Sequence, residues 1–330
     1  MKNVYLHVGM PKTATTFLQA RCFPYLKGIR YQNNAVKDLV DRIIYTNPIL
    51  LDLTNIKQEM AGLLTKMDGE RLLISQERLF GNMLRNYHDN VYLAGCLKVV
   101  FPNAKLIIVI RRQDDLAESI YKQALQSYYC QTLNSFLNYR NGAFEDSCDP
   151  LGLPNLDVKQ MDLHRYVRNY IEHFGRENVC VLPYELLRDD RRAFLDKLSA
   201  ALEVDPVYPA NNYYENRSYS WLACRIALLL NRFVRVEGDG SRLLQFIPDK
   251  PFLSYLKRKA GEKKIYKTLG GISRRLTLRH FLQDGLDRVI YIRRNLISKR
   301  KRESIMAFYR ESNVRLDQEF SLNLKRFGYY

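Results

Sequence analysis

The stretch His7-Val-Gly-Met-Pro-Lys-Thr-Ala-Thr-Thr-Phe17 follows the apolar run Val4-Tyr5-Leu6 and leads into a segment with the pattern of a helix start. A strand, a tight loop with Gly and Pro, and a helix start together expose backbone N–H groups at the positive end of a helix. Such a loop can hold a phosphate or its sulfur analogue, and Lys12 adds a full positive charge. The stretch therefore predicts an anion-binding loop. The alternative is a helix cap beside a solvated lysine.

The order of residues in this loop differs from that of a nucleoside triphosphate loop. The pattern G-x-x-x-x-G-K-[ST], counted from Gly9, requires Gly at position 14 and Lys at position 15. The chain has Ala14 and Thr15 at those positions, and Lys12 precedes the hydroxyl residues. The motif of ATP- and GTP-binding loops is therefore not matched.

Short runs rich in Leu, Ile and Val alternate along the chain with segments of helical periodicity. The runs have the continuous apolar character of strands buried in a parallel sheet, and they cover Val4 to Val8, Leu72 to Ser75, Lys105 to Ile110 and Val179 to Leu182. The helical segments are Val91 to Phe101, Asp114 to Tyr129 and Leu163 to Phe174, the last followed by Gly175. This alternation predicts an α/β fold with a central parallel sheet flanked by helices.

The 330 residues are expected to form one domain, residues 1–330, with an α/β core over 1–208 and a mainly helical part over 209–330. The segment from Asn141 to Asp157 is rich in Gly, Pro, Asn and Asp and predicts a surface loop or lid. Past Pro209 no clear strand pattern remains, and helices are expected near Trp221 to Phe233 and Glu303 to Arg326.

Composition narrows the class of protein. The apolar fraction of 46% is that of a globular chain, and no run is long enough to cross a bilayer. The N-terminus leads directly into the first strand without a leader pattern, which predicts a cytoplasmic protein. The six cysteines and five histidines show no ligand spacing, so reduced thiols and no metal site are expected.

The net charge of +17 is concentrated in one segment. Residues 257–302 contain 16 Lys or Arg and 3 Asp or Glu, an excess of 13 that leaves 4 for the rest of the chain. One interpretation is an amphipathic helix with a solvated basic face. Another is a surface for an anionic acceptor, or for peripheral contact with the inner face of a membrane. Nucleic acid is disfavoured because no nucleic-acid-binding motif accompanies the charge.

Polar residues also follow the strand that ends at Ile110. Arg111 stands at its carboxyl end, and Ser119 lies eight residues later, two turns into the next predicted helix. In an open parallel sheet, ligands bind beyond the carboxyl ends of the strands. Arg111 and Ser119 can therefore converge on one phosphate, with a guanidinium fork and a hydroxyl donor. The alternative is that Arg111 pairs with Asp114 or Asp115 at the start of the helix.

These motifs resemble those of the sulfotransferases that use 3′-phosphoadenosine 5′-phosphosulfate (PAPS). The order Pro11-Lys-Thr-Ala-Thr-Thr16 resembles the family's 5′-phosphosulfate loop, and Arg111 with Ser119 resembles its 3′-phosphate motif, although Gln113 stands where a Pro is common. Tyr184-Glu-Leu-Leu187 resembles the segment whose Tyr lies near the adenine. The segments Asn216 to Phe233 and Phe308 to Tyr330 resemble the bacterial branch, so the likeness spans nearly the whole chain.

The resemblance implies a P-loop-like three-layer fold and transfer of a sulfonyl group from PAPS to a hydroxyl without a metal. The implied donor-binding residues are Pro11, Lys12, Thr13, Ala14, Thr15, Thr16, Arg111, Ser119 and Tyr184. Lys12 is expected to neutralise the leaving phosphate of adenosine 3′,5′-bisphosphate (PAP). Glu77, in Ser75-Gln-Glu77 after the second strand run, is the candidate general base, and His7 is its rival.

The acceptor is expected to be a carbohydrate, a glycolipid or another hydroxyl compound, and the oligomeric state does not follow from the sequence. Two other classes stay open. A small-molecule kinase of the P-loop type would use Mg-ATP and should have the missing Gly-Lys-Ser/Thr order. A basic nucleic-acid-binding protein without enzymatic activity would show strongly salt-dependent binding and no response to nucleotide.

Overall fold

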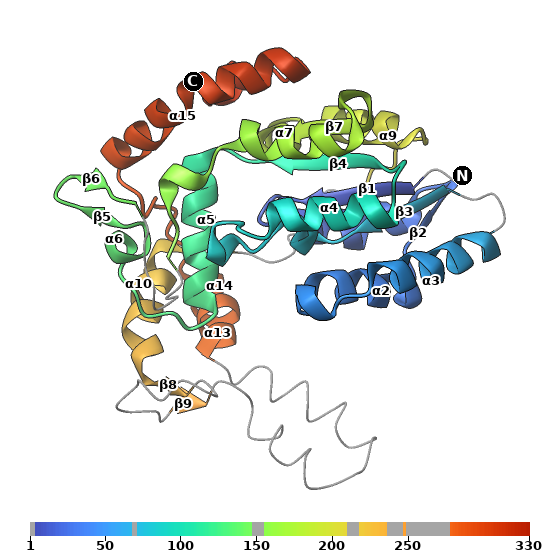
Figure 1. The fold of residues 1–330 in the computed structure, drawn as a ribbon. Coiled ribbons are helices and arrows are strands. Elements are labelled where there is room, and N and C mark those ends of the chain that lie inside the picture. The colour runs from blue at the N-terminus through green and yellow to red at the C-terminus, as the bar shows by residue number, and fades with distance from the viewer. Residues whose placement is uncertain (1–3, 68–70, 147–154, 210–217, 236–246, 249–277) are drawn as a thin grey trace, which may run out of the picture. The chain divides into compact units, whose positions relative to one another are not determined.

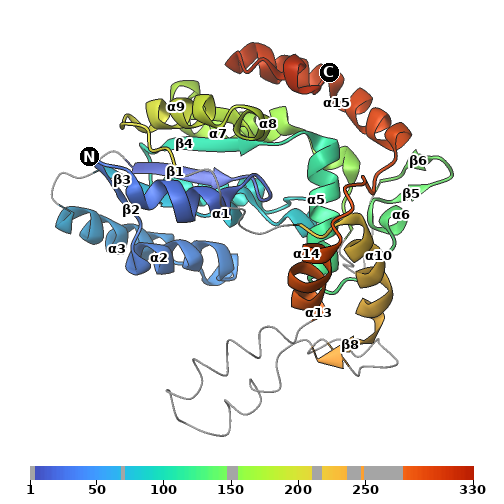
Figure 2. The same ribbon diagram turned by 180° about the vertical axis from the view of Figure 1, so that it is seen from behind.

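Five parallel strands form the central sheet in the order β2-β3-β1-β4-β7 (Figures 1 and 2). The computed structural model describes residues 4–67, 71–146, 155–209, 218–235, 247–248 and 278–330. The strands are β1 (Val4–Gly9), β2 (Ile29–Tyr31), β3 (Arg71–Ser75), β4 (Lys105–Ile110) and β7 (Val179–Pro183). The predicted α/β fold with a central parallel sheet flanked by helices is confirmed.

The central strand β1 explains the continuous apolar runs of the sequence. It lies between β3 and β4, with Leu6 in register with Ile74 on one side and with Leu106 on the other. Every residue of β1 is buried because helices cover both faces of the sheet. Neither face of the strand contacts water, so apolar residues follow one another without alternating with polar ones. His7 is the one polar exception in this strand and is fully buried.

Helices lie on both faces of the sheet and complete three layers. Figures 1 and 2, taken from opposite sides, show α4 and α7 over one face and α1 and α9 over the other. The main helices of the part of the chain that contains the sheet are α1 (Thr15–Phe17), α2 (Asn34–Tyr45), α3 (Leu53–Lys66), α4 (Asn90–Val100), α7 (Leu163–Phe174), α8 (Tyr184–Asp189), α9 (Arg191–Leu202) and α15 (Lys299–Phe320).

Helix α7 shows how local signals set these boundaries. Its N-cap residue Asp162 accepts a hydrogen bond from the backbone N–H of Arg165 at 3.1 Å. The helix ends at Phe174 because Gly175 takes a φ of 86°, which an L-residue adopts only with strain. The range is the one expected from the sequence.

The chain divides into two compact units whose limits differ from the two parts expected on either side of residue 208. The first unit contains residues 1–116, 146–215 and 300–330, and the second contains 117–145 and 216–299. The last helix, α15, therefore belongs with the sheet. Its Tyr309 accepts a hydrogen bond from the backbone N–H of Met161 at 2.7 Å and donates one to the carbonyl of Val158.

The second unit is mainly helical. Helix α5 (Gln113–Gln126) enters it from the first unit, and the other elements are α6 (Leu133–Phe136), the hairpin β5 (Tyr139–Arg140) and β6 (Ala143–Phe144), α10 (Trp221–Leu230), α13 (Leu278–His280) and α14 (Asp287–Val289). The expectation of no strand past Pro209 is wrong in one detail, because β8 (Val234–Arg235) pairs in parallel with β9 (Ile247–Pro248). Residues 257–277 of the basic segment lie outside the described residues.

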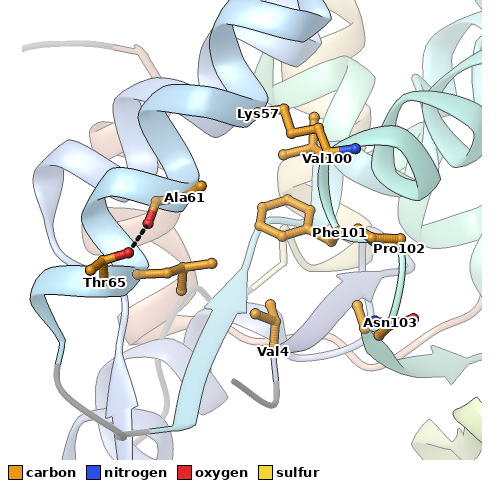
Figure 3. Close-up of a pocket in the computed structure, with 10 residues that line it drawn as sticks. Val4, Lys57, Ala61, Thr65, Val100, Phe101, Pro102 and Asn103 are labelled. Carbon is orange, nitrogen blue, oxygen red and sulfur yellow. Dashed lines mark hydrogen bonds between the residues drawn. The ribbon is translucent and has the colours of Figure 1, made fainter. Parts of the chain in front are cut away.

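A cavity of about 440 Å³ lies at the amino end of the sheet, beneath α3 (Figure 3). Val4 at the start of β1 lines it together with Leu64, Val100 and Phe101, and the few polar residues at its wall include Lys57 and Asn103. Ligands of open parallel sheets bind at the opposite, carboxyl edge of the sheet. Across the described ranges, no helix combines the length and apolar character needed to cross a membrane.

Candidate anion-binding and catalytic site

The loop after β1 forms a concave arrangement of backbone N–H groups. Lys12 and Ala14 both adopt left-handed conformations, with φ of 68° and 64°, and the intervening Thr13 does not. Alternation of the two hands in successive residues turns neighbouring N–H groups toward one point, which is the geometry of an anion nest. Left-handed backbone costs an L-residue about 1–2 kcal/mol, and such strain is retained mainly at functional sites.

One hydrogen bond joins the loop to the sheet, and another lies within the loop. The backbone N–H of Met10 donates to the carbonyl of Val109 in β4 at 2.9 Å, and the Thr13 hydroxyl donates to the carbonyl of Met10 at 2.6 Å. The residue at the cap position of α1 is Ala14, which has no side-chain acceptor. The alternative interpretation of this loop as a side-chain helix cap is therefore not what the structure shows.

Gly9 brings this loop against the residue expected to be the base. Its φ is 108°, and a Cβ atom at this position would lie 3.2 Å from the Cα and carbonyl oxygen of Glu77 and from the backbone nitrogen of Pro11. The close approach of β1 to the turn after β3 thus requires Gly. The end of β1 and the Glu77 turn form one packed unit.

Arg111 lies directly beside the loop. Its Nη1 donates to the carbonyl oxygen of Lys12 at 2.9 Å, and its guanidinium carbon lies 4.7 Å from the centre of the Tyr184 ring. Among the described residues no carboxylate lies within ion-pair distance of Arg111, and its buried Nε has no partner. The charge of Arg111 opposes the rise in the pKa of Glu185 that burial causes, but the two form no ion pair, so the guanidinium keeps donors for an anionic ligand.

The neighbouring arginine has a different role. Arg112, rather than Arg111, forms the acidic pair expected at the start of the helix: its Nε and Nη2 donate to the two Asp114 oxygens at 2.8 and 2.7 Å. Burial alone would raise the pKa of Asp114, but the hydrogen bond from Arg112 and the charges of Arg112 and Arg302 lower it overall. The pair is therefore ionised and anchors the loop that carries Arg111.

Two further contacts with the C-terminal part of the chain hold this loop. The Gln113 amide nitrogen donates to the Asn313 side-chain oxygen at 2.8 Å, and the Asn313 amide donates back at 3.2 Å. Glu185 accepts from the backbone N–H of Arg112 at 3.0 Å and from the Tyr329 hydroxyl at 2.8 Å. Gln113, which stands where the resembling family often has Pro, is thus immobilised by an amide pair.

Glu77 begins the short helix η4 (Glu77–Phe80) directly after β3, next to the loop. Burial raises the pKa of Glu77, while the charge of Lys12, the Thr15 hydroxyl and Arg78 oppose the shift. Thr15 Oγ1 nevertheless has no hydrogen-bond partner within the described residues, so Thr15 lies near Glu77 without forming a regular hydrogen bond to it. Among the ion pairs of the described residues, Arg78 pairs with Asp89 at 3.4 Å and not with Glu77.

His7 lies within β1, two residues before Gly9. It is fully buried, its Nδ1 is 2.7 Å from Ser75 Oγ, and its ring packs edge-on against Phe23 at 5.3 Å. The amide of Gln19 in turn donates to the Ser75 carbonyl at 2.9 Å. Burial lowers the pKa of His7 to about 3, so the imidazole is neutral at physiological pH.

Sequence reasoning missed Tyr87. Its hydroxyl is buried and has no hydrogen-bond partner within the described ranges, and the charge of Glu77 contributes to raising its pKa. The ring packs at right angles against Phe80 at 5.4 Å, and its φ of 54° is unusual for an aromatic residue. No local pattern marks this position, because the contact joins the η4 turn to a loop several residues later.

The remaining predicted donor residues differ in placement. Pro11 and Thr13 are buried within the loop, Thr16 is exposed, and Tyr184 begins α8 at the end of β7. Ser119 is buried on α5, in the part of that helix that belongs to the second unit. Its pairing with Arg111 on one phosphate stays a prediction.

No family model matches the chain, and no curated protein matches it either. Among solved structures, a sulfotransferase from Alicyclobacillus acidocaldarius is similar with 17% identity and a TM-score of 0.44, over 66% of this chain and 87% of that one. A sulfotransferase domain from the curacin biosynthetic pathway has 12% identity and a TM-score of 0.38, over 93% and 97%. Mouse sulfotransferase SULT7A1, complexed with PAP, has 15% identity and a TM-score of 0.29, over 73% and 70%. These three proteins are all sulfotransferases.

Proposed function

We propose that this protein transfers a sulfonyl group from PAPS to a hydroxyl group of an acceptor. The observation that carries the proposal is the position of Arg111. Its guanidinium forms no ion pair within the described residues. It donates a hydrogen bond to the backbone carbonyl of Lys12, in the loop with left-handed residues, and lies over the ring of Tyr184. An anion nest, a cation with no ion-pair partner among the described residues and an aromatic face together suit a phosphorylated adenosine.

In this proposal the loop holds the sulfonated end of the donor. The backbone N–H groups of Thr13 to Thr16 and the hydroxyls of Thr15 and Thr16 bind the 5′-phosphate and the sulfonyl oxygens, and Lys12 neutralises the charge that develops on the bridging oxygen. Arg111, with Ser119, binds the 3′-phosphate, and Tyr184 lies against the adenine. The position of the left-handed residues supports the first of these roles.

The transfer itself is an in-line displacement at sulfur. The acceptor oxygen forms a bond to sulfur as the bond from sulfur to the bridging phosphate oxygen breaks, and its electron pair leaves with PAP. The acceptor proton goes to Glu77, whose raised pKa makes it a stronger base than an ordinary carboxylate while Lys12 favours its ionised form. His7 is the weaker candidate, because it is fully buried and has a pKa of about 3.

We propose a carbohydrate or a glycolipid as the acceptor. The support is the resemblance of the sequence to sulfotransferases and the basic character of the chain, both of which favour a polar or anionic hydroxyl compound.

Two measurements test the proposed function. The first compares thermal stabilisation by PAP with that by ATP and Mg²⁺, because a ligand that binds only the native state raises the unfolding temperature. A sulfotransferase responds to PAP, a kinase responds to ATP with Mg²⁺, and a protein that binds only nucleic acid responds to neither.

The second follows ³⁵S from labelled PAPS into an acceptor in an extract of the source cells. Lys12→Ala is expected to abolish transfer, whereas Lys37→Ala, on the exposed side of α2, is expected to leave it unchanged. Full transfer activity in Lys12→Ala would contradict the role given to Lys12.

A further inference from the structure

The second unit exposes a run of apolar side chains between arginines. Val289, Ile290, Tyr291 and Ile292 are 83%, 47%, 45% and 39% exposed. Residues 288–294 run from the last two residues of α14 into the segment that follows it. We name them the arginine-flanked apolar loop, because Arg288 precedes the four apolar residues and Arg293 and Arg294 follow them. Isolated exposed apolar residues are ordinary, but four in succession favour contact with a lipid phase or a partner.

Buried contacts on both sides hold this loop in an outward orientation. Before it, the carboxylate of Asp287 is buried and accepts from the backbone N–H of Ser220 at 2.9 Å. After it, Glu118 accepts from the backbone N–H groups of Leu296 and Ile297 at 3.1 and 3.3 Å. The exposure of residues 289–292 is therefore built into the fold of this unit.

The loop is also attached to the helix that carries the single tryptophan of the chain. The backbone N–H of Trp221, the first residue of α10, donates to the carbonyl of Ile292 at 3.2 Å. The guanidinium of Arg294 lies 5.3 Å from the centre of the Trp221 ring. Trp221 thus reports directly on the surroundings of the loop.

We propose that the arginine-flanked apolar loop docks the protein on an anionic lipid surface. The side chains of residues 289–292 would enter the boundary between head groups and acyl chains, and Arg288 and Arg293 would contact lipid phosphates. Aliphatic residues with a tyrosine and flanking arginines suit this boundary, because their apolar parts contact the acyl chains while their polar ends stay among the head groups and water. The positive charge of the arginines is complementary to an anionic lipid surface. This proposal does not depend on whether PAPS is the sulfonyl donor.

The test is binding of the full chain to lipid vesicles, followed by co-sedimentation and by Trp221 emission. Vesicles of phosphatidylcholine mixed with phosphatidylglycerol are expected to bind the protein and shift the Trp221 emission to shorter wavelength, and vesicles of phosphatidylcholine alone are expected to bind it weakly. Binding should weaken as salt rises from about 0.1 M, because screening shortens the reach of the arginine charges.

Two double variants separate the apolar and the charged contributions. Val289→Ser with Ile290→Ser keeps every arginine and should lower the vesicle partition coefficient by about tenfold or more. Arg288→Gln with Arg293→Gln should lower it by about fivefold for each arginine. Far-UV circular dichroism and the unfolding temperature check that both variants fold, as expected for changes at exposed positions.

Matched controls carry the same changes elsewhere. Ile49→Ser with Leu50→Ser removes two apolar side chains that are 87% and 75% exposed, and Arg85→Gln with Arg310→Gln removes two exposed arginines. Both controls are expected to bind vesicles as the unchanged protein does. Arg294 is left in place because it contacts Trp221.

Several results would overturn the proposal. One is the absence of binding to mixed vesicles at low salt, and another is unchanged binding by the Val289→Ser, Ile290→Ser variant. A concentration-dependent dimer in the absence of lipid that this variant abolishes would assign the loop to a second copy of the chain. Binding of duplex DNA that the same variant abolishes would assign it to nucleic acid.

Discussion

Replacement of Arg111 by Gln tests the donor site through the residue on which it depends most. The guanidinium is half-buried and has no carboxylate partner among the described residues, so its charge is available to an anionic ligand. A hydrogen bond between a charged donor and a phosphate contributes about 1.5–3 kcal/mol. The dissociation constant of PAP should therefore rise by about 10- to 100-fold in Arg111→Gln.

The fold should tolerate this change. Arg111→Gln loses one hydrogen bond to the Lys12 carbonyl, about 1 kcal/mol, and a cation–π contact with Tyr184 of about 0.5–1 kcal/mol. It also removes a partly desolvated charge that forms no ion pair among the described residues, which offsets part of that loss. Thermal unfolding without ligand should therefore change by only a few degrees.

Arg112→Gln is the matched control at the next position. It breaks the two hydrogen bonds to Asp114, whose side chain is 1% exposed, and should cost about 1.5–3 kcal/mol of stability, because Arg302 still donates to Asp114 at 2.7 Å. Isothermal titration calorimetry with PAP and thermal unfolding of both variants separate the two effects. The reasoning is refuted if Arg111→Gln binds PAP as tightly as the unchanged protein, or if folded Arg112→Gln loses as much affinity.

Three further changes test other parts of the site. Glu77→Gln should lower kcat by about 10²- to 10⁴-fold and remove the rise of kcat/KM with pH that the raised pKa of Glu77 produces; an unchanged pH–rate profile would exclude it as the base. His7 has a pKa of about 3 in the native state against an ordinary 6.5, so the unfolded chain takes up a proton that the native chain refuses, and the free energy of unfolding should fall as pH falls from 6.5 toward 3. Denaturant titrations at several pH values should show a shallower fall in His7→Gln, and an equal slope would contradict the burial argument. Gly9→Ala should cost about 1–2 kcal/mol and weaken PAP binding because its Cβ would press on Glu77, whereas Gly62→Ala, with open space around it, should be neutral or slightly stabilising. Equal unfolding free energies for the two glycine variants would remove the close-approach argument.

The sequence contained enough information to predict the sheet and the strand ends. Four buried strands need long apolar runs on both faces, and these runs are visible without coordinates. The edge strand β2, Ile29–Tyr31, was not predictable because three residues carry too little pattern. The pair β8 and β9 escaped for the same reason, since each has two residues.

The separate roles of Arg111 and Arg112 could not be read from their order. The pattern Arg-Arg-Gln-Asp-Asp allows either arginine to pair with the acidic residues. The structure shows that Arg112 is the partner of Asp114. The Gln113–Asn313 and Glu185–Tyr329 contacts join positions 200 and 144 residues apart. No local spacing encodes such pairs, so the support of the loop was beyond sequence reasoning.

The most direct test of the proposed donor site compares PAP with adenosine 5′-monophosphate, which lacks the 3′-phosphate, on the unchanged protein and on Arg111→Gln. If Arg111 holds the 3′-phosphate while the loop of residues 12–16 holds the 5′ end, PAP should bind at least about tenfold tighter than the monophosphate, and this gap should close in Arg111→Gln. Equal affinities of the unchanged protein for the two nucleotides, or a gap that persists in the variant, would contradict the assignment of Arg111 and with it the proposed donor.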